Sequence, residues 1–214
     1  MILEAKNVDY FYKANKDRKI LDQVSYGFDI GKMYAILGPS GSGKTTFLSL
    51  LAGLDTPVHG EILYNQEDIL KKGLHHHRRE NVSLIFQSYN LIDYLTPREN
   101  VMLGGTGNPE ELLGAVGIPK EDWNRKVLEL SGGQQQRVAI ARALASPAQV
   151  LLADEPTGNL DEETAEEIIG LLKQSAHELH KCVIVVTHSK QLAKEADCVV
   201  EIKHGSVRTA GDVK

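Results

Sequence analysis

The clearest chemical signal in the sequence is a glycine-rich segment that ends in a lysine and a threonine. Glycines let successive backbone N–H groups curve around an anion, and the N-terminus of a following helix adds about half a positive charge. Lys44 then reaches the β- and γ-phosphates, and the Thr45 hydroxyl binds Mg²⁺. The segment therefore predicts the binding of a nucleoside triphosphate with Mg²⁺, and we include Thr46 among the nucleotide-binding residues. Its residues match G-x-x-x-x-G-K-S/T: Gly38, Pro39, Ser40, Gly41, Ser42, Gly43, Lys44 and Thr45.

The sequence does not match two other nucleotide-binding patterns. A dinucleotide-binding turn needs glycine or alanine at the position of Thr46. A guanine-reading motif needs an Asn-Lys-x-Asp string after a buried strand, but Asn15-Lys16-Asp17 follows no such strand and Arg18 stands in place of the final aspartate. A glycine-rich turn without a ligand is the structural alternative for residues 38–45.

Two adjacent carboxylates, Asp154 and Glu155, follow an apolar run from Val150 to Ala153. The pair suits two tasks, because Asp154 would hold Mg²⁺ through its water shell while Glu155 polarises the attacking water. A strand that ends in a solvated acidic turn is the alternative. Together with the glycine-rich segment, the pair favours nucleotide hydrolysis.

A second candidate phosphate cradle precedes the predicted helix Gln135 to Ala145. A serine there is placed to cap the helix, and two glycines expose N–H groups at its N-terminus. One chain has one γ-phosphate to bind, so two cradles in one sequence predict that the second serves a nucleotide held by another copy. The same start would also suit an ordinary helix cap. The residues of this cradle are Ser131, Gly132, Gly133 and Gln134.

The elements around these motifs predict an α/β fold. Interleaved apolar residues from Ile2 to Val8 and from Val24 to Ile30 indicate half-buried antiparallel strands. Later apolar runs indicate strands buried on both faces, with helical patterns between them, which is typical of a mainly parallel sheet. We expect a P-loop core, an N-terminal antiparallel β subdomain and a small helical insertion at about residues 88–135. The runs are Met33–Leu37, Val82–Phe86, Val150–Ala153 and Cys182–Val186, and the helical patterns are Lys44–Ala52, Glu110–Val116 and Thr164–His180.

Length and composition indicate one domain over residues 1–214, of which 42% are hydrophobic. A formal net charge of −5 argues against nucleic-acid binding. Cys182 and Cys198 both lie beside apolar runs, which predicts a reduced, cytosolic protein. No apolar stretch approaches the roughly 18 to 20 residues that span a bilayer, and Met1 to Lys6 lacks a secretory signal.

Together these motifs resemble those of the ATP-binding-cassette (ABC) ATPases, and the resemblance covers essentially the whole chain. The segment Leu130 to Gln134 is similar to the family's signature motif. The resemblance implies that Gln87 is a glutamine that touches Mg²⁺ and the attacking water, that Asp161 belongs to the D-loop, and that His188 is the switch histidine. It makes Glu155, His188, Gln87 and Lys44 the candidate catalytic residues, and Thr45, Gln87 and Asp154 the candidate metal ligands.

The resemblance also implies a ring that stacks on adenine, either Tyr12 or, as the alternative, Phe11. The runs Leu130 to Arg142 and Leu151 to Asp161 are particularly similar to subunits of lipoprotein-release, macrolide-export and antimicrobial-peptide transporters. These subunits are ATP-hydrolysing motors: two copies close on two Mg-ATP molecules and drive a separately encoded membrane permease. The implied activity is therefore export or extraction of a peptide, drug or lipoprotein at the inner face of the cell membrane.

Two other functions stay open. One is a subunit that signals to a cell-wall enzyme without transport, and the sequence does not separate it from an exporter. The other is a DNA-maintenance or translation ATPase. The lack of long heptad insertions and of a strong basic face argues against the second.

Two surface segments carry further expectations. Apolar residues crowd the segment Ser88 to Leu103, within an insertion that is shorter than is usual in the family. Some of them would pack inside the insertion, and the remainder, Tyr94 and Leu95 among the candidates, predict a groove for a short permease helix. The run His75-His76-His77-Arg78-Arg79 looks like a metal or anion site. Successive residues on one helix cannot face one centre, so a solvated basic surface is expected for residues 75–79.

Overall fold

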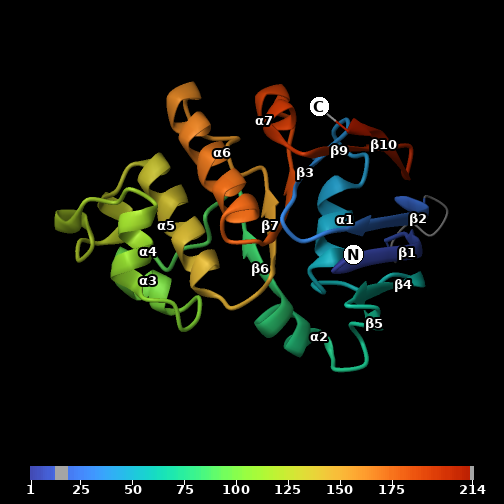
Figure 1. Cartoon of the computed structure of the whole chain (residues 1–214), viewed down its shortest axis with the longest axis horizontal. Coiled ribbons are helices and arrows are strands. Elements are labelled where there is room, and N and C mark those ends of the chain that lie inside the picture. The colour runs from blue at the N-terminus through green and yellow to red at the C-terminus, as the bar shows by residue number, and fades with distance from the viewer. Residues whose placement is uncertain (13–18, 213–214) are drawn as a thin grey trace.

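The computed structural model describes residues 1–12 and 19–212, so the string from Asn15 to Arg18 lies outside the described residues. A four-stranded sheet lies at one end of the longest axis and helices α3 to α5 lie at the other (Figure 1). A six-stranded sheet runs from β6 and β7 in the middle of the view to β9 and β10, which lie above the four-stranded sheet, and α6 and α7 pack along it (Figure 1).

The four-stranded sheet is antiparallel, as the interleaved N-terminal pattern predicts. Its second predicted strand is displaced, because a turn at Ile30 and Gly31, where φ is 76° at the glycine, already leads into the next strand. Ile30 is consequently exposed. The strand order is β2-β1-β4-β5, formed by β1 (Leu3–Tyr10), β2 (Leu21–Phe28), β4 (His59–Tyr64) and β5 (Glu67–Asp68).

The six-stranded sheet is parallel except for its last strand, β10, which pairs antiparallel with β9. Alternate residues of its central strands enter two different cores. In β3, Tyr34 and Ile36 pack with α1 and the antiparallel sheet, whereas Met33 and Ala35 pack with α5 and α6. Burial on both faces explains why these strands are continuous apolar runs. The order is β10-β9-β3-β8-β7-β6, formed by β3 (Met33–Leu37), β6 (Val82–Ile85), β7 (Val150–Asp154), β8 (Cys182–Val186), β9 (Cys198–Lys203) and β10 (Ser206–Asp212).

Side-chain caps begin several helices. Thr96 and Ser131 each form a capping box, with Glu99 and Gln134 respectively. Within the described residues, no helix combines the length and apolar character that crossing a bilayer requires. The helices are α1 (Lys44–Leu51), α2 (Leu74–His76), α3 (Pro97–Met102), α4 (Pro109–Ala115), α5 (Gly132–Ala145), α6 (Glu162–His177) and α7 (Lys190–Glu195), with a π-helix η1 (His77–Asn81) and 3₁₀ turns η2 (Lys120–Asp122) and η3 (Val127–Glu129).

The expectation of a solvated basic surface at residues 75–79 is wrong for His77, which is buried where α2 passes into η1. Its Nε2 lies 2.9 Å from the Leu51 carbonyl oxygen at the end of α1, and its Nδ1 lies 3.2 Å from Asn81 Nδ2. Gly53 allows this approach, since a Cβ there would lie 3.1 Å from the imidazole. His77 therefore joins α1 to the segment that leads into β6.

Candidate nucleotide-binding site

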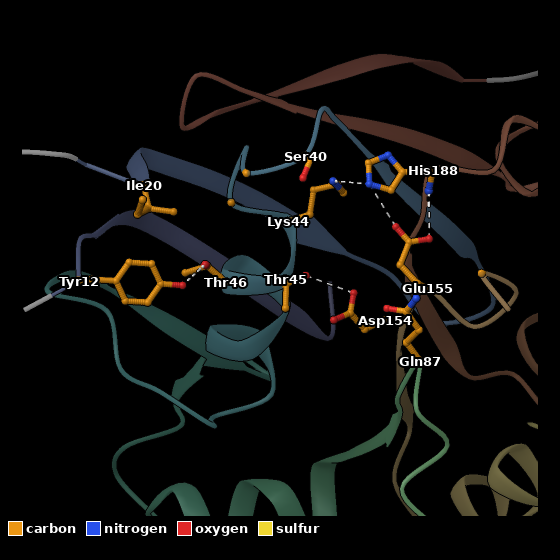
Figure 2. Close-up of a pocket in the computed structure, with 13 residues that line it drawn as sticks. Tyr12, Ile20, Ser40, Lys44, Thr45, Thr46, Gln87, Asp154, Glu155 and His188 are labelled. Carbon is orange, nitrogen blue, oxygen red and sulfur yellow. Dashed lines mark hydrogen bonds and ion pairs between the residues drawn. The ribbon is translucent and has the colours of Figure 1, made fainter. Parts of the chain in front are cut away.

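Four neighbouring parallel strands place the candidate residues at one edge of the sheet. The glycine-rich loop follows β3, Gln87 follows β6, Asp154 ends β7, and His188 comes shortly after β8. Parallel strands end at the same edge, where α/β proteins bind their ligands. Figure 2 shows Lys44, Asp154, Glu155, His188 and Gln87 grouped there.

A cavity of about 810 Å³ lies at this edge, within the range of small-molecule sites. It brings together most of the predicted residues. Ile20 and Gly158 also line it, and the sequence analysis missed both. The cavity is lined by Tyr12, Ile20, Ser40, Gly41, Gly43, Lys44, Thr45, Thr46, Gln87, Asp154, Glu155, Gly158 and His188.

The glycine-rich loop is closely packed from behind. A Cβ on Gly38 would lie 2.3 Å from the Ile202 carbonyl oxygen, and one on Gly43, where φ is 101°, would lie 3.0 Å from the Ile20 carbonyl oxygen. Only glycine fits these positions without a shift of the backbone. Gly38, Pro39 and Ser42 do not line the cavity, but the Ser42 hydroxyl is buried and has no hydrogen-bond partner among the described residues.

Lys44 is buried at the start of α1, and its ammonium group points back along the loop. Its Nζ donates to the carbonyl oxygens of Gly38 at 2.9 Å and Pro39 at 3.2 Å. Burial lowers the pKa of Lys44, and the negative charges of Glu155 and Asp154 act against that shift. The charge of Lys44 is thus held by the loop that would surround the phosphates.

Thr45 and Asp154 form a hydroxyl–carboxylate pair, with Thr45 Oγ1 lying 3.4 Å from Asp154 Oδ1. Burial raises the pKa of Asp154, and the hydrogen bond from Thr45 opposes that rise. In the part of the chain that the structure describes, no three His, Cys, Asp or Glu side chains form a metal-binding group. Two oxygen ligands beside a phosphate cradle fit Mg²⁺, which typically binds to one or two carboxylates together with substrate phosphates.

Glu155 adopts a left-handed conformation with φ of 46°, held by its N–H bond to the Val186 carbonyl oxygen at 2.9 Å. Its Oε2 accepts the His188 backbone N–H at 3.2 Å, and its Oε1 lies 3.4 Å from His188 Nε2. Lys44 Nζ lies 3.3 Å from the same nitrogen. Lysine can only donate, so that contact needs an unprotonated Nε2, whereas an ion pair with Glu155 needs a protonated ring.

Tyr12 stands at the opposite side of the site from His188 (Figure 2). Its side chain is exposed, and its hydroxyl lies 2.9 Å from Thr46 Oγ1. The ring packs edge-on against Tyr10, with centroids 5.4 Å apart, and Tyr10 donates to Asp55, which raises the pKa of Tyr10 to about 12. Tyr12 therefore presents a supported aromatic face to the cavity.

The second cradle and Asp161 do not line the cavity of their own chain. The Ser131 hydroxyl accepts the Gln134 N–H at 3.2 Å and so caps α5, while Asp161 caps α6 by accepting the Thr164 N–H at 3.0 Å. In Figure 1, α6, β6 and β7 lie between α5 and α1. The predicted phosphate contacts of residues 131–134 thus have no counterpart within one chain.

A second hollow, of about 410 Å³, lies elsewhere and differs from the groove expected at Ser88 to Leu103. Leu103 is the member of that segment that lines it. Leu91 packs against the core beneath the insertion, and Tyr94 is exposed outside the hollow. We call this hollow the arginine groove, and it is lined by Arg78, Arg79, Val82, Ser83, Leu84, Leu103, Gly104, Arg142, Ala143 and Ser146.

Comparison with known proteins identifies what the chain is similar to. A family model described as ABC transporter matches residues 21–158. An uncharacterized ABC transporter ATP-binding protein, YclH of Bacillus subtilis, is 45% identical over 96% of this chain and 95% of its own length. The macrolide export ATP-binding/permease protein MacB of Photorhabdus laumondii is 40% identical over 96% of this chain, which spans 34% of MacB.

A solved structure of an ATP-binding cassette is also similar to this chain. It is described as a dimeric structure of a post-hydrolysis state of the ATP-binding cassette MJ0796 bound to ADP and Pi. MJ0796 is a protein of Methanocaldococcus jannaschii. The superposition covers 100% of this chain and 99% of the other, with a TM-score of 0.88 and 36% sequence identity.

Proposed function

The chain belongs to the ABC transporter family of ATP-binding ATPases, and on that premise we propose that two copies close on two ATP molecules and drive a separately encoded membrane permease. One observation carries this proposal: Lys44, Thr45, Asp154, Glu155 and His188 converge at one strand edge around a single cavity. A cation, a metal-binding pair and an acid–base pair there match the requirements of phosphoryl transfer to water.

Each residue has a distinct task in hydrolysis. Lys44 exchanges its bonds with the loop carbonyls for the β- and γ-phosphates. Glu155 polarises the attacking water, because its carboxylate is aimed into the cavity while the backbone is held by β8. His188 faces the γ-phosphate position, since its ring lies beside Lys44 and its backbone N–H donates to Glu155. Mg²⁺, held by Thr45, Gln87 and Asp154, would neutralise phosphate charge.

The second cradle supports action as a pair. The capping box uses the N–H groups of Ser131 and Gln134, and the glycines between them lie at the positive end of α5. Residues 131–134 do not line the cavity of their own chain. In a symmetric dimer, residues 131–134 and Asp161 would complete the partner's site. This arrangement makes hydrolysis depend on closure of the two copies.

The arginine groove supports a membrane partner. Leu84 and Leu103 give it apolar contact, and its three arginines give it positive charge in a chain of net charge −5. A short amphipathic helix with an acidic residue matches this chemistry. The chain would then lie at the inner face of the membrane through its permease. Its similarity to MacB, a macrolide export protein, supports export of a drug, and the sequence resemblance adds a peptide or a lipoprotein as the alternatives.

Co-purification tests the permease. A tagged chain in its own cells should carry an integral membrane protein through detergent extraction, and Leu103→Glu should reduce that yield at least about tenfold, because a carboxylate enters the apolar part of the groove. Leu128→Glu is the matched control, since Leu128 is 60% and Leu103 61% exposed and Leu128 does not line the groove. Both variants should bind ATP. Equal yields from both variants would remove the groove from the proposal, and the absence of any membrane protein with the wild type would remove the permease.

A further inference from the structure

The turn that follows Gln87 has an unusual backbone at its last two residues. Tyr89 and Asn90 both have positive φ, at 61° and 48°. Such conformations are uncommon for residues other than glycine, cost on the order of 1 kcal/mol or more each, and persist only where surrounding contacts hold them. Bonds within the turn use the N–H groups, from Tyr89 to the Phe86 carbonyl oxygen at 3.1 Å and from Asn90 to the Ser88 carbonyl oxygen at 2.6 Å. The carbonyl oxygens of Tyr89 and Asn90 are bound by an anchor from outside the turn.

Arg142, in the last turn of α5, supplies that anchor. Its two terminal nitrogens donate to consecutive carbonyl oxygens, at 2.9 Å to Tyr89 and at 2.5 Å to Asn90. These bonds cross 52 and 53 residues of sequence. The planar fork of a guanidinium suits two acceptors at a fixed spacing, which a lysine cannot match. Arg142 is half-buried, and desolvation lowers its pKa, so its charge is poorly compensated without the two carbonyls.

The anchored turn fixes the start of the same segment. The exposed side chain of Gln87 lines the nucleotide cavity only two residues before Tyr89. Other contacts at Gln87 are weak, with its carbonyl oxygen 3.4 Å from Asn159 Nδ2. The Tyr89 hydroxyl lies close to Gly132 at the opposite end of α5, since a Cβ there would come within 3.1 Å of it. Both ends of α5 thus contact the turn that follows Gln87.

We propose that Arg142 is a positioning residue for ATP hydrolysis, which holds Gln87 in register with the cavity through the carbonyl oxygens of Tyr89 and Asn90. The proposal rests on the role proposed for Gln87. Arg142 also lines the arginine groove, so the same guanidinium borders this groove and binds the turn after Gln87. An anion in that groove would compete with the carbonyls for it.

Steady-state kinetics of the full chain test this role. Arg142→Ala should lower kcat about 10- to 100-fold, the size expected when a reacting group is displaced by about 1 Å, while KM for ATP changes less than about threefold. Arg142→Lys should recover part of kcat, because an ammonium group reaches one carbonyl at a time. Unchanged kcat in Arg142→Ala would overturn the proposal.

Two controls separate positioning from stability. Lys181→Ala removes another half-buried cation that donates to a backbone carbonyl, that of Ala148, and should lower the melting temperature without lowering kcat. A loss of kcat in Lys181→Ala as large as in Arg142→Ala would overturn the proposal. Arg142→Lys keeps the side-chain volume and charge and serves as the readout if Arg142→Ala does not fold.

A double-mutant cycle locates the effect. If Arg142 acts through Gln87, adding Arg142→Ala to Gln87→Ala should lower kcat by less than about twofold further. Fully multiplicative losses would contradict this route. If Gln87→Ala alone keeps wild-type kcat, the role proposed for Gln87 fails as well, whereas a loss in Gln87→Ala beside a normal Arg142→Ala defeats only the role of Arg142.

Discussion

At the scale of single residues, His188 lies between the cation and the carboxylate of the site. Its Nε2 lies within 3.4 Å of both Glu155 and Lys44, and the two contacts require different protonation states of the ring. Movement of Lys44 toward phosphate would leave Glu155 as the nearer partner of His188.

Tyr12 gives the residue-scale prediction. Tyr12→Ala should raise KM for ATP about 5- to 150-fold, because stacking on a base contributes roughly 1–3 kcal/mol. It should leave kcat nearly unchanged, because the ring contacts the base equally in the ground and transition states. Tyr12→Phe keeps the ring but loses the contact with Thr46, so its KM should stay near wild type. Steady-state ATPase assays measure both constants. If KM is unaltered in Tyr12→Ala, the stacking role passes to Phe11.

At the scale of elements, His77 links the C-terminus of α1 to η1, and this link is pH-dependent. The Leu51 carbonyl can only accept, so Nε2 carries the proton and Nδ1 accepts from Asn81. Burial lowers the pKa of His77, and the positive charges of Arg78 and His76 lower it further. The neutral ring is thus the form that suits the folded protein.

This gives a prediction with a definite sign. Below the ordinary histidine pKa of about 6.5 the unfolded chain binds a proton that folded His77 does not, so the free energy of unfolding should fall as pH drops from about 7 toward the lowered pKa. Urea unfolding at several pH values measures it. His77→Gln should flatten this part of the profile and cost about 1–3 kcal/mol at pH 8, since it disturbs the bond to Leu51. His75→Gln, at an exposed neighbour, should keep the wild-type slope, and an equal slope in all three proteins would contradict the assignment.

The same elements show what a sequence can and cannot predict. The runs at β3, β7 and β8 are predictable because burial on both faces leaves no polar position, and the glycine-rich loop because its backbone conformation demands glycine. The burial of His77 is not predictable, since it depends on close packing against Gly53, which lies far from His77 in the sequence. Ile20 and Gly158 were missed for another reason, because neither has a side chain that signals phosphate chemistry.

The arginine groove was also beyond sequence analysis. Apolar residues after Gln87 suggested a surface, but side chains such as Leu91 turn inward to fill the insertion. The groove instead combines residues from η1, β6 and α5 that lie far apart in sequence. Its charge comes from arginines that also make other contacts, Arg79 with the adjacent Glu80 and Arg142 with the distant Tyr89. Tertiary packing, rather than local pattern, decided its location.

At the scale of the whole molecule, the separation of the two phosphate cradles matters most. The glycine-rich loop faces its own cavity, whereas Ser131 and Gln134 cap a helix that contributes nothing to that cavity. A chain acting alone would leave the positive end of α5 unused for catalysis. In a two-fold dimer, each α5 would face the other chain's cavity, so each of the two sites would combine the glycine-rich loop of one chain with residues 131–134 of the other.

The predicted dimer depends on ATP and on Ser131. Glu155→Gln keeps the shape of the side chain but loses its charge, so hydrolysis should fall about 10²- to 10⁴-fold and the ATP-bound state should accumulate. Size-exclusion chromatography with light scattering should then give twice the 23.6 kDa chain mass with Mg-ATP and the single mass without it.

Adding Ser131→Arg to Glu155→Gln should abolish the dimer, because the larger side chain would occupy the space of the γ-phosphate. Thr96→Arg in the same background is the matched control, since Thr96 forms the same kind of capping box on α3, and its loss should cost about 0.5–2 kcal/mol of stability but leave the dimer intact. A mass that responds neither to ATP nor to the change at Ser131 would refute the shared site. Equal loss of the dimer in both arginine variants would mean that dimerisation requires helix capping and not contact with the nucleotide.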